Sequence, residues 1–227
     1  MKISVIIPTL NEEATLRKNL VRLKRGSGVE LIVVDGGSRD DTLRIARDFT
    51  RKVYSSLPGR ARQMNEGARH AEGEILFFLH ADSRLSPGAL GKIAPLFSNP
   101  AIAAGAFSLD IDSGKWPLRL IALLANWRTR ISGIPYGDQG LFLLKETFEK
   151  IGGYPDIPIM EDVQIARQIR KIGKIRILSE KLATSPRRWE KEGIFFTTLR
   201  NRLLMIGHFL GISPQRLAGY YKNIRTC

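Results

Sequence analysis

Short apolar runs alternate with segments of helical spacing along the first 82 residues of the chain. The runs are rich in Val, Ile and Phe and are apolar on both faces, as in strands that are covered on both sides. The segments between the runs place apolar residues three or four positions apart, as in amphipathic helices. The pattern predicts strands at 3–7, 29–37, 53–55 and 74–82, and helices at 12–25, 38–49 and 60–71. Strands and helices in this order predict an open, mostly parallel α/β sheet.

Beyond residue 85 the pattern is less regular, and its elements vary more in length. Helices are expected at 87–97, 116–131, 146–152 and 161–172, and strands at 103–112, 137–145, 175–178 and 182–185. The rest of the chain is expected to be helical and basic. Neither an internal repeat nor a low-complexity linker divides the sequence, and 227 residues fit one α/β domain.

Polar clusters follow three of the predicted strands, at 9–12, 35–38 and 80–83. In open α/β sheets, ligands bind at the carboxyl ends of the strands. Because parallel strands end at the same edge of a sheet, we expect the three clusters to meet there. Ser38 is also the expected N-cap of the helix after the second strand. The pattern therefore predicts a ligand site at this edge.

The chain carries 36 Lys and Arg residues against 22 Asp and Glu residues, a formal net charge of +14. This charge bears on partners, and it suits phosphorylated substrates, anionic lipid or nucleic acid. No zinc finger, helix-turn-helix or aromatic RNA-binding motif accompanies it, so no nucleic-acid partner is expected. The single cysteine, Cys227, excludes an intramolecular disulfide, and the first apolar run is too short for a signal peptide. We therefore expect a cytoplasmic protein.

Two segments, 116–134 and 194–212, are the most apolar stretches of the chain. A charge at the centre of a bilayer costs roughly 2.5–3.5 kcal/mol, which argues against membrane spans. The basic residues within the two segments are Arg119, Arg128, Arg130, Arg200, Arg202 and His208. Both are expected to be amphipathic helices that pack on the domain or, alternatively, make peripheral contact with the inner face of the cell membrane. The net charge of +6 over 187–225 suits that contact, or a lipid-phosphate acceptor.

Four motifs occur in a fixed order: VIIPTLNEE, VVDGGSRDDT, FLHAD and GGYPDIPIMEDVQIARQIRKIG. Together they resemble the inverting glycosyltransferases of family 2, which have the GT-A fold, and the resemblance covers residues 3–173. GDQGLF and TSPRRWEKEG are similar to motifs of a bacterial subgroup of small members. The resemblance implies one GT-A-like domain with a Rossmann-like nucleotide-sugar half at 1–84, an acceptor half at 85–186 and a basic helical segment at 187–227. The implied reaction transfers a sugar from a nucleoside-diphosphate sugar to an acceptor hydroxyl, with a lipid-linked acceptor as one option.

The resemblance assigns the donor to the first half of the chain. It implies that Asp35 accepts a hydrogen bond from a base N–H and that Arg60 faces the base or the phosphates. The implied donor-binding residues are Pro8, Thr9, Leu10, Glu12, Asp35, Gly37, Ser38, Arg60, Ala81 and Asp82. From residue types alone, Asp35 is a turn or capping aspartate, Glu12 a capping acid and Arg60 a surface arginine.

The segment His80-Ala81-Asp82 occupies the place of the family's Asp-X-Asp metal motif. The resemblance implies that Asp82, which matches the last acid of that motif, binds Mg²⁺ or Mn²⁺. These ions take one or two carboxylates together with phosphate oxygens of the substrate. His80 replaces the first acid, which weakens the metal assignment without removing it. Contact of His80 with a ribose hydroxyl or Mn²⁺ and a helix-capping role are both left open.

Glu161 and Asp162 open a predicted helix. The resemblance implies that Asp162 is the catalytic base and that Glu161 orients the acceptor, whereas two acids in a first helical turn are also stabilised by the helix dipole. Four more residues are assigned to the acceptor or the diphosphate: Asp138, Gln139, Arg188 and Trp189. A turn at 137–139 and surface packing at 187–189 are the alternatives. The glutamine that leads the Arg-Trp motif of polymerising relatives is absent, which argues against polymerisation.

Three other classes of protein compete with this interpretation. A nucleotidyltransferase usually has a loop with glycine and lysine after the first strand, and a dinucleotide-binding dehydrogenase has G-x-G-x-x-G there. The loop in this chain is Pro8-Thr9-Leu10-Asn11, which matches neither. A non-catalytic basic module for membranes or nucleic acid explains the charge, but it leaves the acids at strand ends and helix starts without a role.

Overall fold

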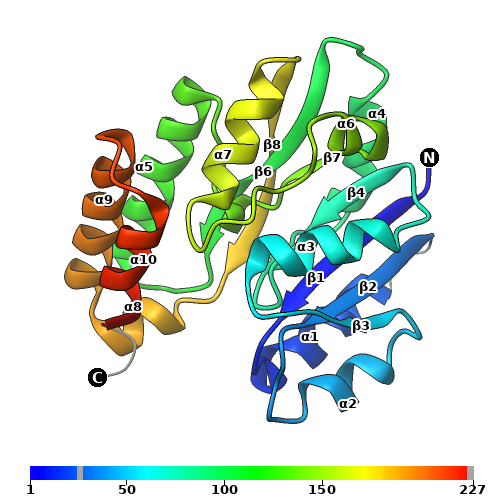
Figure 1. Cartoon of the computed structure of the whole chain (residues 1–227), viewed down its shortest axis with the longest axis horizontal. Helices are drawn as coiled ribbons and strands as arrows, with labels where there is room; N and C mark the ends of the chain where they lie inside the picture. Colours follow the sequence, from blue (N-terminus) through cyan, green and yellow to red (C-terminus); the bar gives the residue numbers. More distant parts are fainter. Residues whose placement is uncertain (25–27, 224–227) are drawn as a thin grey trace.

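The computed structural model describes residues 1–24 and 28–223, and these residues form an eight-stranded sheet that curls through the molecule (Figure 1). The strands follow the order β3-β2-β1-β4-β7-β6-β8-β5 across the sheet. Their bounds are β1 Ile3–Thr9, β2 Val29–Asp35, β3 Val53–Ser55, β4 Ile75–Phe78, β5 Arg84–Leu85, β6 Ile102–Ile111, β7 Phe142–Leu144 and β8 Lys174–Thr184. The expectations that rest on Arg225 and Cys227 lie outside the described residues.

The first four strands of the chain form the parallel half of the sheet. β1 pairs in parallel with β2 and β4, and β2 pairs in parallel with β3. The register places Thr9 beside Asp35 at the ends of β1 and β2. Beyond the strands, the Gly36 N–H donates to Thr9 O at 2.9 Å and the Leu79 N–H donates to Ile6 O at 3.0 Å. The three polar clusters therefore meet at one edge, as the pattern predicts.

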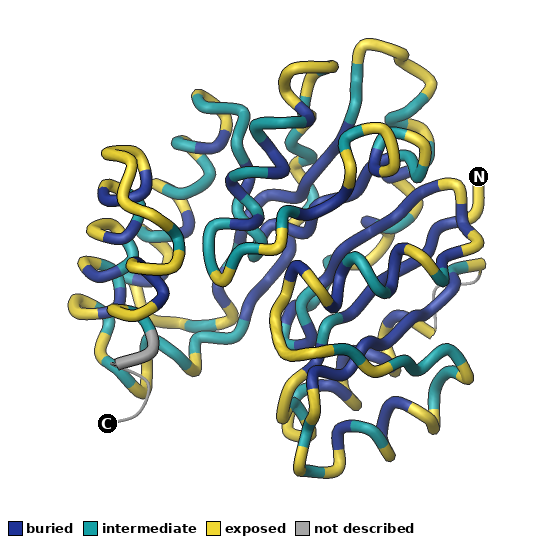
Figure 2. The backbone as a smooth tube through the Cα atoms, in the orientation of Figure 1, coloured by how far each residue is buried: buried dark blue, intermediate teal, exposed yellow. Residues whose placement is uncertain are grey.

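Helices cover both faces of the sheet, and its strands are the most deeply buried part of the molecule (Figure 2). α1, α2 and α4 pack on one face, and α3, α6 and α7 pack on the other. Burial from both sides explains why the strands read as continuous apolar runs. The helix bounds are α1 Glu13–Lys24, α2 Thr42–Arg47, α3 Arg60–Arg69, α4 Ile93–Leu96, α5 Trp116–Ser132, α6 Lys145–Lys150, α7 Glu161–Arg170, α8 Arg187–Glu192, α9 Ile194–Phe209 and α10 Pro214–Asn223, with 3-10 turns η1 Ala89–Lys92 and η2 Gly137–Gln139.

In the second half of the sheet, β7 and β8 differ from the strands that the sequence predicts. β7 runs antiparallel to β4 and β6, while β6 runs parallel to β8. β8 is one continuous strand instead of the two expected at 175–178 and 182–185, because β6 pairs with it on both sides of an irregularity between Phe107 and Ser108. The strand expected at 137–145 is limited to β7, because Gly140 has a φ of +63° and ends the η2 turn.

Two predicted helices also differ in detail. The helix expected at 87–97 is split into η1 and α4, and Gly88 before it has a left-handed backbone. Ser38 is not an N-cap, because α2 begins later, after Asp41. The basic helices expected at 116–131 and after 187 are present as α5 and α8 to α10. In the part of the chain that the structure describes, no helix combines the length and the apolar character needed to cross a bilayer.

Candidate active site

Asp35 ends β2 beside Thr9 at the end of β1, and it is only 1% exposed. Its Oδ2 accepts hydrogen bonds from the N–H groups of Gly37 at 2.9 Å and Ser38 at 2.8 Å. Its Oδ1 accepts hydrogen bonds from the hydroxyls of Ser38 and Thr9. These bonds hold the turn at 35–38, as expected for a turn aspartate. The buried carboxylate therefore fixes the backbone conformation at this edge of the sheet.

Hydrogen bonds join the loop after β1 to the loop after β2. Asn11 has a left-handed backbone with φ of +54°, and its Oδ1 accepts a hydrogen bond from the Arg39 N–H at 2.9 Å. The Asn11 N–H donates to Ser38 Oγ at 2.8 Å, and the Glu12 N–H donates to Thr42 Oγ1 at 2.8 Å. Side-chain bonds therefore fix the predicted nucleoside-binding segment, which begins at Pro8 and Thr9 in β1 and continues through the exposed Leu10.

Gln63 of α3 joins the same two strand ends from the other side. Its Nε2 donates to Thr9 O at 2.7 Å and to Val34 O at 2.8 Å. A Cβ at position 36 would lie 3.2 Å from the Gln63 amide, so Gly36 allows the close approach. Gln63 is not predicted from the sequence, because a glutamine on an amphipathic helix is usually exposed and carries no signal of its own.

Asp82 lies after β4, and Arg187 of α8 faces it. Arg187 Nη2 is bonded to Glu12 Oε1 and lies 3.6 Å from Asp82 Oδ2. Burial and the nearby Glu12 raise the pKa of Asp82, although Arg187 and other arginines act in the opposite direction. Beneath Asp82, Ala81 is buried and its carbonyl accepts a hydrogen bond from a side chain of α1. Arg187, the neighbour of the predicted Arg188, therefore joins the C-terminal segment to the donor edge.

The donor set at Asp82 fits a divalent ion that is shared with a ligand. The carboxylate is a hard oxygen ligand, and its side chain remains 20% exposed towards solvent. Among the described residues, no three His, Cys, Asp or Glu side chains are grouped so that they could hold an ion by themselves. An ion here would need further oxygen ligands, such as those of a diphosphate.

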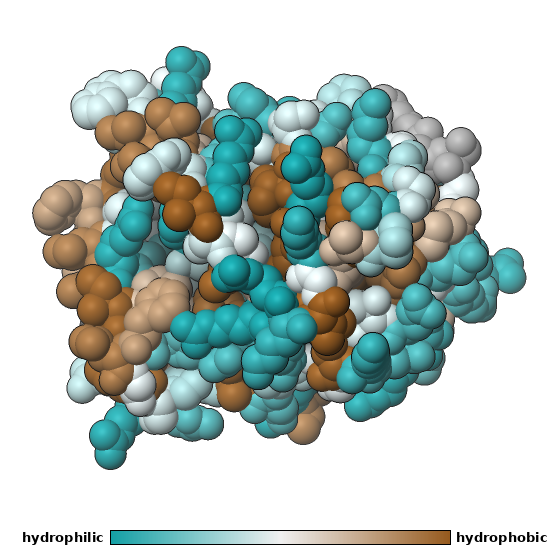
Figure 3. All heavy atoms as spheres, turned by 90° about the horizontal axis from the view of Figure 1, so that it is seen from above, coloured by the Kyte–Doolittle hydropathy of each residue, from teal (hydrophilic) through white to brown (hydrophobic). Residues whose placement is uncertain are grey.

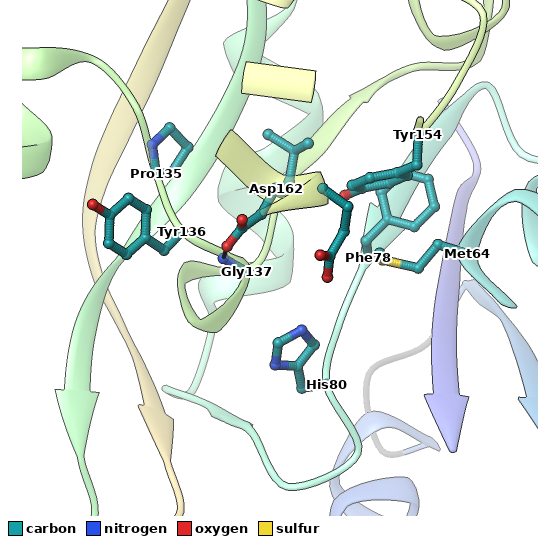
Figure 4. Close-up of a pocket in the computed structure, with 10 residues that line it drawn as sticks. Met64, Phe78, His80, Pro135, Tyr136, Gly137, Tyr154 and Asp162 are labelled. Carbon is teal, nitrogen blue, oxygen red and sulfur yellow. Dashed lines mark hydrogen bonds between the residues drawn. The ribbon is translucent and has the colours of Figure 1, made fainter. Parts of the chain in front are cut away.

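A small pocket lies between the parallel half of the sheet and α7 (Figure 4). Met64, Phe78 and Tyr154 form an apolar wall on one side, and Pro135 and Tyr136 lie on the other. The remaining lining residues are His80, Gly137, Leu141, Glu161 and Asp162. The pocket therefore combines an apolar wall with two carboxylates from the start of one helix.

Asp162 is held at the pocket by backbone donors. The Gly137 N–H donates to Asp162 Oδ2 at 2.7 Å, and the Val163 N–H donates to Oδ1 at 2.7 Å. A Cβ at position 137 would lie 3.1 Å from the His80 ring and 3.5 Å from Asp162 Oδ2, so the glycine leaves room for the His80 ring. His80 and Asp162 therefore both lie beside Gly137 at the pocket (Figure 4).

Burial and mutual repulsion raise the pKa values of two other acids around Asp162. Burial, followed by the charge of Asp162, raises the pKa of Glu161 to about 7. The same two causes raise the pKa of Asp138 to about 6. Keeping buried acids close together costs stability, because each disfavours the charged form of the others. Clusters of acids with raised pKa values are therefore typical of catalytic sites.

Two basic side chains complete the electrostatics of the site. Burial, and then the charges of Arg60 and Arg188, lower the pKa of His80 to about 3, so its imidazole is neutral at pH 7. Desolvation lowers the pKa of Arg60, but nearby groups that include Glu161, Asp162 and Asp82 raise it overall. Glu161 and Asp162 of the pocket and Asp82 of the donor edge therefore all raise the pKa of the same side chain, Arg60.

Two predicted acceptor residues point away from the pocket. Gln139 is 0% exposed, its Oε1 accepts hydrogen bonds from Thr129 Oγ1 and the Tyr136 N–H, and its Nε2 donates to Phe107 O. Trp189 packs against the apolar cluster between α5 and β6. The turn alternative fits Gln139, whose side chain is fully buried and bonded within the protein, and the packing alternative fits Trp189, which is partly buried against this cluster.

The raised pKa of Glu161 predicts a pH-dependent stability difference. The folded protein favours the protonated acid, so this contribution is complete below about pH 4.5 and is lost as the pH rises through about 7. Relative to the wild type, Glu161→Gln is expected to gain on the order of 1–3 kcal/mol of unfolding free energy across this window. Urea unfolding of both proteins at several pH values measures the difference. If the unfolding free energies of the two proteins changed in parallel with pH, the raised pKa of Glu161 would be contradicted.

The sheet, the helices on its two faces and the site at the strand ends define a GT-A glycosyltransferase fold. The mannosyltransferase PcManGT from Pyrobaculum calidifontis, solved in complex with GDP-Man and Mn²⁺, aligns with a TM-score of 0.62 at 21% identity, over 80% of this chain and 56% of that one. The chain belongs to glycosyl transferase family 2, whose sequence pattern matches residues 4–153. The predicted fold and family are both confirmed.

Curated relatives support the family and extend beyond this chain. An uncharacterised glycosyltransferase of Mycobacterium tuberculosis is 32% identical over 168 residues, which are 67% of this chain and 62% of the relative. The beta-monoglucosyldiacylglycerol synthase of a Nostoc species is 25% identical over 187 residues, 72% of this chain and 40% of the relative. The chain therefore spans less than two thirds of the length of either relative.

Proposed function

We propose that this protein is an inverting glycosyltransferase that transfers a sugar from a nucleoside-diphosphate sugar to an acceptor hydroxyl. The observation that carries the proposal is the pocket that brings His80, two residues before Asp82, beside Glu161 and Asp162 at the ends of the strands. In this proposal residues 1–84 bind the donor, residues 85–186 bind the acceptor, and Arg187 at the start of the basic C-terminal segment lies at the donor edge. Family membership supports the transfer of a sugar.

The nucleoside is proposed to bind at the ends of β1 and β2, whose following loops are joined by hydrogen bonds. Pro8, Thr9, Leu10 and Glu12 would border it on one side, and Gly37 and Ser38 on the other. Asp35, whose bonds hold that turn, fixes the backbone shape of the base site. It is also the proposed acceptor for a base N–H, which would replace one of the two hydroxyl bonds that its Oδ1 now accepts. Because the glycines present backbone without side chains, a nucleotide can approach this turn closely.

The diphosphate is proposed to lie between Asp82 and the arginines around it. Arg60, Arg187 and Arg188 supply positive charge that stabilises the departing nucleoside diphosphate. A divalent ion, Mg²⁺ or Mn²⁺, held by Asp82 and diphosphate oxygens would supply additional positive charge to the same leaving group. The structure of PcManGT, which holds GDP-Man together with Mn²⁺, supports this assignment. Arg187 would release its contact with Asp82 when the diphosphate arrives.

Asp162 is proposed to be the general base. Its two bonds to backbone N–H groups hold the carboxylate at the pocket, where it removes the proton from the attacking acceptor hydroxyl. One direct displacement at the anomeric carbon then inverts its configuration. Glu161 and Asp138 orient the acceptor, while Gln139 positions the η2 turn that carries the Gly137 donor. The Nostoc relative, named for a glucosylated diacylglycerol, supports a lipid-linked acceptor.

A thermal-shift panel of sugar nucleotides, each with and without Mn²⁺, tests the proposed function. A donor that binds the folded protein raises its melting temperature, by an amount that corresponds to about 2.7 kcal/mol at a concentration 100 times the Kd. We expect at least one uridine, guanosine or thymidine diphosphate sugar to do so. A panel in which no sugar nucleotide changes the melting temperature would contradict the donor assignment.

A further inference from the structure

Two neighbouring helices, α5 and α9, turn apolar side chains towards solvent. Figure 3 shows these side chains gathered at the end of the molecule that α5 and α9 form on the left of Figure 1. We call this surface the α5–α9 face. Its exposed members are Trp116, Leu120, Leu123, Leu124, Trp127 and Ile131 from α5, and Phe195, Phe196, Leu199, Leu203, Ile206 and Phe209 from α9. Residues that recur three or four positions apart form one stripe on each helix.

α9 buries polar side chains and exposes apolar ones, the reverse of a helix on the surface of a water-soluble domain. Its buried side includes Arg200, which is 7% exposed and paired with Glu192 at 2.6 Å, and His208. Its exposed side includes Phe195, which is 80% exposed, and Phe209. A surface helix of a water-soluble domain normally buries its apolar side. An apolar patch of this extent marks an interaction surface.

The helices of the face, and α10 beside α9, carry charge of a single sign. α5, α9 and α10 contain no Asp or Glu in their described sequences. They do contain exposed arginines, namely Arg119 and Arg130 on α5, Arg202 on α9 and Arg216 on α10. Glu190 of the neighbouring α8 is exposed and pairs with Lys115 at 3.8 Å, so the charge that borders the apolar residues is mainly positive. Such a face is complementary to a surface of apolar chains and anionic headgroups.

We propose that the α5–α9 face docks on the surface of an anionic lipid bilayer. The two exposed tryptophans, Trp116 and Trp127, suit the boundary between headgroups and acyl chains. A second copy of the chain suits the face less well, because a symmetric contact would bring the same arginines together and α5, α9 and α10 carry no acid to offset them. Lipid phosphates instead supply a counter-charge for each arginine.

The docked face lies next to the candidate active site along the chain. α5 ends at Ser132, and the residues that follow it, Pro135 to Gly137, line the pocket. Docking would therefore hold the pocket close to the membrane. The docking itself depends only on the two helices, so it stands or fails independently of the proposed transferase reaction.

Vesicle flotation tests the docking with two matched pairs of variants. The first pair is Leu123→Glu on the face, where the side chain is 64% exposed, and Val21→Glu on the distant α1, where it is 37% exposed. The second pair is Arg119→Gln/Arg130→Gln and the control Lys18→Gln/Arg22→Gln, all at exposed positions. Vesicles of phosphatidylcholine, alone or mixed with phosphatidylglycerol, are the probe, and circular dichroism confirms that each variant is folded.

The wild type and both controls are expected to float with the phosphatidylglycerol vesicles and to be released by high salt. Leu123→Glu is expected to stay in the soluble fraction, and each arginine removed is expected to weaken partitioning about fivefold. Failure of the wild type to float, or equal flotation of Leu123→Glu, would overturn the proposal. A wild-type dimer in sedimentation velocity that Leu123→Glu dissociates, without vesicle binding, would assign the face to a second copy instead.

Discussion

Asp162→Asn is expected to lower kcat by about 10²–10⁴-fold while sugar-nucleotide binding is retained. The amide can still accept one of the two backbone hydrogen bonds that Asp162 receives from Gly137 and Val163, so the pocket should keep its shape. It cannot remove a proton from the acceptor hydroxyl. Initial rates of transfer and calorimetric titration of the donor measure the two effects separately.

A matched control for this variant is Asp156→Asn. Asp156 precedes α7 on the same side of the molecule, is exposed and pairs with Arg62. Loss of that exposed pair should change stability by at most about 1 kcal/mol and leave transfer unchanged. If Asp162→Asn transferred sugar at a rate close to that of the wild type, the base would have to be another acid of the pocket, with Glu161 the first to test.

Asp82→Ala is expected to remove most of the gain in donor affinity that Mn²⁺ provides, by about tenfold or more. Among the described residues no three His, Cys, Asp or Glu side chains are grouped so that they could hold an ion, so the variant removes the one carboxylate assigned to the ion and leaves Glu12, which shares Arg187 with Asp82, as the nearby acid. Isothermal titration of the donor identified by the thermal-shift panel, with and without Mn²⁺, gives the two affinities whose ratio is compared.

Asp48→Ala serves as the control for Asp82→Ala. Asp48 is an exposed acid that pairs with Arg17 on the outer surface of the donor half. Its removal changes the net charge by the same amount, so a general electrostatic effect would appear in both variants. An unchanged Mn²⁺ effect in Asp82→Ala would contradict the metal assignment, whatever the absolute affinity of the donor.

The sequence predicts the donor half of the molecule well, because each of its elements has a strong local signal. Buried parallel strands produce continuous apolar runs, and polar residues at the ends of such strands must meet at one edge. The convergence of Thr9, Asp35 and Asp82 is therefore predictable without knowledge of any side-chain contact. The antiparallel β7 and the continuous β8 are not predictable in this way, since their pairing depends on distant partners.

The sequence predicts where a residue lies in the fold better than it predicts what its side chain contacts. Gln139 and Gln63 are buried polar residues whose bonds to backbone groups become visible only when the fold is known. Arg187 and Arg188 are adjacent and chemically identical, yet it is Arg187 that reaches Glu12. The α5–α9 face is predicted only as amphipathic, because the spacing of apolar residues does not show which side of a helix faces the protein.

A crystal structure of the protein with its sugar-nucleotide donor and Mn²⁺ tests the central claim most directly. We predict a nucleoside at the ends of β1 and β2, an ion between Asp82 and the diphosphate, and a sugar whose anomeric carbon faces Asp162. A nucleotide bound elsewhere, for example in the open groove between α5 and β8 beside Arg176, with no ligand near Asp35, Asp82 and Asp162, would contradict the account.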